Sequence, residues 1–143
     1  MILLDTNVLS ETHRPQPSTA VRDWLNSRAP SELYLCTPVL AELRYGLERL
    51  PSGRRRDRLE EWLHSLEQDY FVDRILPFDQ QAAHEFGRIM SRRETAGRPI
   101  KTMDALIAAV AVCHAAAIAT RDISDFDSLG LELIDPFGQP DTR

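Results

Sequence analysis

Cysteine and long apolar runs are scarce in this sequence of 143 residues. Its two cysteines, Cys36 and Cys113, lie in apolar segments, as small buried hydrophobic residues do, although one disulfide between them stays open. No apolar run is long enough to cross a bilayer, and the first residues lack the basic and apolar regions of a secretory signal. We therefore expect a cytoplasmic protein that does not associate with membranes.

An excess of positive charge is also missing. The chain has 17 basic and 22 acidic side chains, which gives a formal net charge of -5. This balance argues against a protein that binds nucleic acid by covering phosphates with lysine and arginine. The argument weakens if several acidic residues bind divalent cations, because bound cations reverse the local charge.

Motifs of nucleotide binding and nucleophilic catalysis are absent as well. The sequence has no glycine-rich phosphate loop, no dinucleotide-binding glycine motif and no nucleophile elbow. The four histidines, at positions 13, 64, 84 and 114, lie on separate predicted elements and lack metal-site spacing. We interpret them as structural or surface residues.

Short apolar segments alternate with longer segments of helical periodicity along the chain. Candidate helix caps are Thr37, Asp79 and Thr102. Strands that alternate with helices predict an α/β fold with a mostly parallel sheet covered on both faces. No linker divides the chain, so we expect residues 1–143 to form a single domain. The predicted strands cover residues 2–4, 33–36, 74–78, 118–120 and 131–134.

Four acidic residues lie where such a fold gathers functional side chains. Asp5 and Asp122 lie just past the ends of predicted strands, whose carboxyl ends border the functional crevice of an open α/β sheet. Glu42 and Asp104 lie near the starts of two helices with apolar faces. A carboxylate against apolar surface is costly unless a cation or a hydrogen-bond donor partners it. Together the four residues predict a metal site.

Each carboxylate also has a purely structural interpretation. Asp5 would cap the following helix, Asp104 would favour a helix dipole, Glu42 would be solvated, and Asp122 would lie in a turn. The functional interpretation depends on their joint placement. Carboxylate oxygens suit Mg²⁺ or Mn²⁺ rather than zinc. One or two such ions activate a water and stabilise the attacking and leaving oxygens of a phosphodiester.

Four segments, taken in order, resemble the acidic motifs of PIN-domain nucleases. Their order and the chain length are similar to VapC-type toxins of type II toxin–antitoxin systems, closest to the FitB-like branch. The resemblance covers nearly the whole chain. It implies a three-layer PIN fold with a sheet of about five strands, and Mg²⁺- or Mn²⁺-dependent endonucleolytic cleavage of RNA. The segments are MILLDTNVLS at 1–10, TPVLAEL at 37–43, DALIAA at 104–109, and ATRD at 119–122 with the DF pair at 125–126.

The resemblance also implies residue roles and partners. It assigns Asp5, Glu42, Asp104 and Asp122 to catalysis and to the metal site. Thr6 would hydrogen-bond to the Asp5 carboxylate. The implied partners are an RNA substrate, a cognate antitoxin that blocks the site, a second copy of the chain, and larger assemblies with the antitoxin. Further positions are Asn7 in the same pocket, Thr120 orienting a ligand or contacting phosphate, and Asp125 as a further ligand or an outer-shell residue.

Basic residues form two groups along the chain. The first is Arg54–Arg56 with Arg58, and the second comprises Arg92, Arg93, Arg98 and Lys101. A solvated surface explains either group. Because Arg98 and Lys101 directly precede the helix that carries Asp104, our hypothesis is that these two bind substrate phosphate.

Rival functions place carboxylates similarly. A phospho-acceptor receiver domain has two adjacent acidic residues after its first strand, whereas Thr6 and Asn7 follow Asp5 here. A haloacid-dehalogenase-like phosphatase needs a second aspartate where Asn7 stands. A non-catalytic PIN-like binding module and a metal-dependent nuclease acting on DNA stay open.

Overall fold

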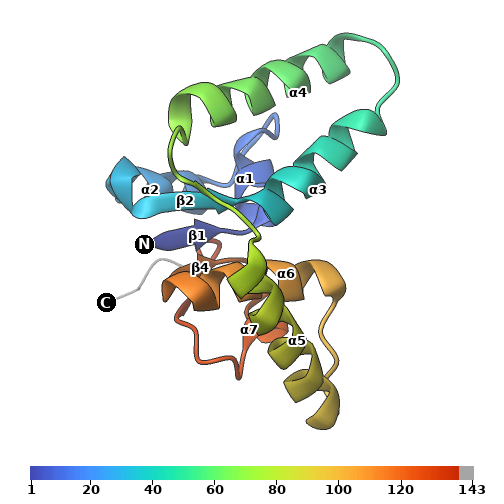
Figure 1. Cartoon of the computed structure of the whole chain (residues 1–143). Coiled ribbons are helices and arrows are strands. Elements are labelled where there is room, and N and C mark those ends of the chain that lie inside the picture. Colours follow the sequence, from blue (N-terminus) through green and yellow to red (C-terminus); the bar gives the residue numbers. More distant parts are fainter. Residues whose placement is uncertain (139–143) are drawn as a thin grey trace.

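Five short parallel strands form the centre of the computed structural model, which describes residues 1–138 (Figure 1). Their order in the sheet is β3-β2-β1-β4-β5. Residues 139–143 of the predicted single domain lie outside the described residues. The strands are β1 Ile2–Leu4, β2 Leu33–Cys36, β3 Ile75–Leu76, β4 Ala117–Ala119 and β5 Leu133–Ile134.

Helices fill the connections between the strands. A 3₁₀ turn at Pro30–Glu32 precedes β2, and a π-helical turn at Leu66–Tyr70 follows α4. No helix of residues 1–138 combines the length and the apolar character that a membrane crossing requires. The helices are α1 Thr6–Thr12, α2 Thr19–Asn26, α3 Thr37–Glu48, α4 Arg54–Ser65, α5 Gln80–Thr95, α6 Thr102–His114 and α7 Ile123–Phe126.

The strand order places the helices in two groups. The chain moves outward from β1 to β2 and β3, then returns across the sheet to β4 and β5. Because crossovers between parallel strands are right-handed, this reversal puts α1–α4 on one face and α5–α7 on the other. Figure 1 shows these two groups in opposite halves of the molecule. The predicted three-layer α/β fold is confirmed. The strand order reverses between β1 and β4, and such a point is where ligands bind in open α/β sheets.

Helix α6 is central, as its composition predicts. Ala105 and the whole run from Ile107 to Ala111 are buried, so this helix packs on nearly all sides. Its small side chains allow close packing against α5 and β4. A buried α6 holds its first turn, with Asp104, at a defined place beside the sheet.

Two predicted elements are shorter than expected. The strand predicted at 74–78 is limited to β3, because Pro77 has no amide hydrogen to continue the ladder. The strand predicted at 131–134 contains only the residues of β5. Both lie at the edges of the sheet, where only one neighbour specifies pairing.

Of the three candidates Thr37, Asp79 and Thr102, Asp79 alone is confirmed as a cap, since its side chain accepts a hydrogen bond from the Ala82 amide at 3.0 Å. The prediction that Thr37 caps α3 is wrong. Its hydroxyl instead accepts from the Phe78 amide at 2.9 Å, which ties α3 to the chain after β3. The prediction that Thr102 caps α6 is also wrong. Thr102 is the first residue of α6, and Lys101 holds the cap position.

Both cysteines are free. Cys36 is buried, and burial raises the pKa of its thiol to about 12, so the thiol stays protonated and unreactive. All four histidines are exposed, and the ring of His13 stacks on Trp62 with centroids 4.6 Å apart.

Arg93 corrects the expectation of a solvated basic cluster. Only 5% of this α5 residue is exposed. Its Nε donates to the carbonyl of Arg98 at 2.7 Å, and its Nη1 donates to the carbonyls of Asp125 and Asp127 at 3.0 and 3.3 Å. Arg93 therefore joins α5 to the loop before α6 and to the end of α7.

We expect Arg93→Met to lower the free energy of unfolding by about 2–3 kcal/mol, because three carbonyls lose a charged donor and burial leaves them unsatisfied. Urea unfolding followed by circular dichroism measures the change. The exposed neighbour provides the control, because Arg92→Met should change stability by no more than about 0.5 kcal/mol. Equal stability of the two variants would contradict the internal role of Arg93.

Candidate active site

Asp5 lies at the carboxyl end of β1 and is only 5% exposed. Its backbone amide donates to the carbonyl of Ala119 at 2.9 Å, which joins the ends of β1 and β4. Its carboxylate accepts hydrogen bonds from the Thr6 amide at 2.7 Å, the Thr120 hydroxyl at 2.7 Å and the Asn7 side-chain amide at 3.2 Å. Asp5 thus caps α1, and the cap holds its carboxylate in a fixed orientation at the sheet edge.

Thr6 connects Asp5 to Glu42. The Thr6 amide binds Asp5, whereas its hydroxyl donates to Glu42 Oε1 at 2.6 Å. The expected bond between Thr6 and the Asp5 carboxylate therefore comes from the backbone, and the side chain reaches across to α3. This contact brings the half-buried Glu42 to the carboxyl end of β1.

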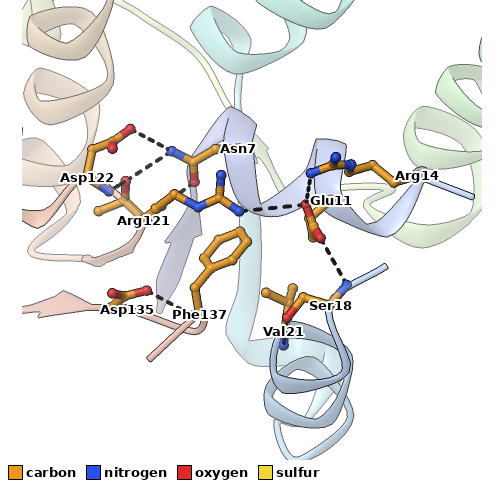
Figure 2. A network of polar contacts seen from close by, with 10 residues as sticks. Asn7, Glu11, Arg14, Ser18, Val21, Arg121, Asp122, Asp135 and Phe137 are labelled. Carbon is orange, nitrogen blue, oxygen red and sulfur yellow. Dashed lines mark hydrogen bonds and ion pairs between the residues drawn. The ribbon is translucent and has the colours of Figure 1, made fainter. Parts of the chain in front are cut away.

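Thr120 and Asn7 attach Asp122 to the same network. Thr120 is fully buried, and its hydroxyl donates to Asp5 and accepts from the Asp122 amide at 3.0 Å. The side-chain amide of Asn7 donates to Asp122 Oδ2 at 3.1 Å, and its oxygen accepts from the Arg121 amide at 3.1 Å. Figure 2 shows the contact between Asn7 and Asp122.

Asp104 lies in the first turn of α6, close enough to the other carboxylates to be affected by their charges. Burial is the main cause that raises its pKa from 3.8 to about 6, and the charges of Asp5, Asp125 and Glu42 raise it further. Lys101 acts in the opposite direction. The structure therefore places Asp104 and Asp125 within the electrostatic range of Asp5 and Glu42.

The pKa of Asp5 is also raised, mainly by burial. Hydrogen bonds from Thr120 and Thr6 oppose this shift, whereas the charges of Glu42 and Asp122 add to it. The site therefore carries negative charge that its own donors do not fully offset. Such an excess is the electrostatic environment that a bound cation relieves.

The carboxylates of these acidic residues offer oxygen ligands, which fit a hard divalent cation such as Mg²⁺. Within residues 1–138, no group of three or more His, Cys, Asp or Glu side chains stands ready to hold a metal ion. Two general properties of metal sites reconcile the suitable oxygen ligands with the lack of a preformed group among these residues. Carboxylates without a cation repel one another, and Mg²⁺ is usually held by one or two carboxylates together with waters and substrate phosphates. The ligand set of Asp5, Glu42, Asp104 and Asp122 stays a prediction.

The two basic candidates differ in their surroundings. Arg98 Nη2 lies 2.8 Å from Asp127 Oδ1, and this ion pair raises the pKa of Arg98 and lowers that of Asp127. A phosphate contact by Arg98 requires that pair to open. Lys101 lies close enough to Asp104 to lower its pKa, so it stands nearer to the acidic residues.

Glu11 and Arg121 extend the network, and sequence reasoning missed their contact. Arg121 Nη2 lies 3.8 Å from Glu11 Oε2, and its guanidinium carbon lies 3.9 Å from the centre of the Phe137 ring (Figure 2). Glu11 also accepts from the Ser18 amide at 2.9 Å and from Arg14 at 3.2 Å. Burial raises the pKa of Glu11, but these partners outweigh burial and lower it. One signal was available, because Glu11 stands one helical turn after Asn7.

We expect Asp104→Asn to stabilise the metal-free protein near neutral pH. The raised pKa means that the folded state disfavours the charged form, so its destabilising effect grows as pH rises from 3.8 to about 6 and is complete above that. With solvent screening, the gain in unfolding free energy should be about 1–2 kcal/mol.

Urea unfolding in EDTA, near neutral pH and near pH 4, measures this gain. The gain should disappear at the lower pH, where Asp104 is protonated. Asp23→Asn, an exposed position on α2, is the control and should have little effect at either pH. A neutral or destabilising result for Asp104→Asn near neutral pH would contradict the raised pKa.

Residues 2–130 match the PIN domain family model. Toxin FitB of Neisseria gonorrhoeae is 40% identical over 137 residues, which cover 96% of this chain and 99% of that protein. VapC ribonuclease Y4jK of Sinorhizobium fredii is 39% identical over 137 residues, which cover 96% of this chain and 98% of that protein. The structure of FitAB bound to a DNA fragment matches with a TM-score of 0.92 and 37% identity over 100% of both chains.

Proposed function

The chain belongs to the PIN-domain family, and we propose that it is the toxin of a type II toxin–antitoxin pair, an endoribonuclease that uses Mg²⁺ or Mn²⁺ to hydrolyse RNA. The observation that carries this proposal is the set of carboxylates at the ends of β1 and β4, with excess negative charge at Asp104. The likeness to a VapC ribonuclease and to toxin FitB supports the substrate class and the toxin role.

In this proposal, the chain's own residues orient the ligands. Thr6 and Thr120 hold the Asp5 carboxylate, Thr6 holds Glu42, and Asn7 holds Asp122. Asp104 completes the set from α6. A divalent cation held by these carboxylates would supply an activated water and would offset the charge that develops on the phosphodiester.

Two further residues take supporting roles in the proposal. Lys101, at the start of α6, contacts a phosphate of the substrate. Asp125, whose charge raises the pKa of Asp104, serves as a further ligand or as an outer-shell residue. Arg98 would contact phosphate only after its ion pair with Asp127 opens.

The partners follow from the same assignment. The solved FitAB complex supports a cognate antitoxin for this chain, which would cover the acidic site. We propose a homodimer of the chain, larger assemblies with that antitoxin, and action in the cytoplasm.

Metal-dependent cleavage should be lost in Asp5→Asn. Purified protein is incubated with structured RNAs in Mn²⁺, Mg²⁺ or EDTA, and the initial rates are compared. We expect the rate to fall by at least about 100-fold in the variant, because a neutral side chain no longer offsets the cation's charge. Asp23→Asn should cleave as the native protein does.

The same assay separates the remaining candidates. Single-stranded DNA of matched sequence, cleaved faster than RNA, would favour the DNA-directed nuclease. Cleavage that persists in EDTA or in Asp5→Asn would contradict the proposed mechanism. Absence of both cleavage and metal binding by calorimetry would indicate a non-catalytic binding module.

Thr120 tests whether hydrogen bonding positions the ligands. Thr120→Val removes the hydroxyl that holds Asp5 and the Asp122 amide, whereas Thr120→Ser keeps it. We expect the cleavage rate to fall about 10- to 100-fold in the valine variant, which is typical when a partner of a metal ligand is lost. The serine variant should retain most of the rate. Equal activity of both variants would show that this hydroxyl does not orient the site.

A further inference from the structure

A groove of about 760 Å³ lies between α1, α3 and α4. Figure 1 shows α3 and α4 as two arms of a helical hairpin, with α1 beside them. Thr6 and Glu42 belong to the groove's lining, so the groove opens directly on the candidate active site. Its volume is in the range of about 300–1,000 Å³ that is typical of ligand sites.

Flat and apolar side chains form much of the groove's surface. The rings of His13 and Trp62 both line it, stacked with an interplanar angle of 19°. Leu43, Leu50 and Leu59 add aliphatic surface. Nucleobases stack on such aromatic surfaces with little dependence on sequence.

The arginines at the start of α4 differ in their surroundings. Arg56 turns back and donates to the carbonyls of Leu47 and Leu50, each at 2.9 Å. Arg55 and Arg58 line the groove and are exposed. Among residues 1–138, neither of these two has an ion pair or a side-chain hydrogen bond.

This arrangement concentrates positive charge where the chain as a whole has a net charge of -5. Arg14 is a third basic residue of the lining, although it pairs with Glu11. A ligand that matches these features is a polyanion with flat apolar groups, and it must reach an acidic site built for a phosphodiester. Single-stranded RNA has all of these properties.

We propose that this groove binds unpaired nucleotides of the RNA next to the cleaved bond, with a base against the His13–Trp62 pair and phosphates at Arg55 and Arg58. The proposal rests on the proposed ribonuclease function and names the form in which its substrate is recognised. It assigns substrate affinity to α4, an element that contributes no acidic residue to the site.

The test uses fluorescence in the full chain. The protein has two tryptophans, so Trp24→Phe leaves Trp62 as the reporter inside the groove. Short single-stranded RNA homopolymers are titrated in EDTA, where binding is measured without turnover. We expect quenching of Trp62 that saturates with RNA, and about tenfold weaker binding of an abasic ribose-phosphate chain, because base stacking is lost.

Charge is tested by Arg55→Gln with Arg58→Gln in the same background. We expect RNA binding to weaken about tenfold at low salt, and the slope of log K against log salt to fall by about 1.4, as expected for two lost phosphate contacts on a single strand. Arg54→Gln with Arg92→Gln is the matched control, since both are exposed arginines that do not line the groove. The control pair should leave quenching unchanged and the Kd within about twofold of the parent.

The outcomes separate this proposal from the ribonuclease itself. Metal-dependent RNA cleavage with an unchanged KM in the Arg55 and Arg58 double variant, and no quenching of Trp62, would overturn the groove and leave the nuclease intact. Quenching by poly-glutamate but not by RNA would show that the groove takes an acidic polypeptide, which also overturns it. Saturable quenching by RNA without cleavage in any metal would support the groove and reject the nuclease.

Discussion

The candidate site depends on one buried carboxylate, that of Asp5. Burial makes its charge costly, and the structure meets that cost with three donors from neighbouring residues and from the end of β4. The same donors bind further acidic groups, because Thr6 reaches Glu42 and Thr120 holds the Asp122 amide. The hydrogen bonds that stabilise Asp5 therefore also assemble the carboxylates around it.

Charge is separated in space within an acidic protein. The negative groups gather where the strand order reverses, between β1 and β4. In contrast, Arg55 and Arg58, which have no ion pair within residues 1–138, line a groove on the outer hairpin of α3 and α4. The average composition hides this separation. The net charge argued against a nucleic-acid partner, yet Arg55 and Arg58 place local positive charge in this groove, where the proposal puts the phosphates of the RNA.

The order of the strands and helices along the chain, and the placement of the acidic residues near their ends, follow from the sequence alone. One apolar run ends abruptly at Asp5 and another ends shortly before Asp122. Both mark strand ends, because a polar group cannot continue a buried strand. The helix that starts near Asp104 was recognisable as buried because its residues are apolar on nearly all sides. These are local properties of polarity and period, and they were sufficient for the α/β fold and for the list of candidate site residues, whose catalytic role stays a prediction.

The strand order and the partners of long or polar side chains, in contrast, depend on tertiary packing. Thr6 bonds to a residue 36 positions away, Arg93 lies inside while Arg98 pairs with Asp127, and Arg56 turns inward while Arg55 and Arg58 line the groove. The polarity pattern of the sequence does not distinguish these arginines from one another. The choice depends on which carbonyls and carboxylates other elements bring within reach, and that becomes defined only when the helices pack on the sheet.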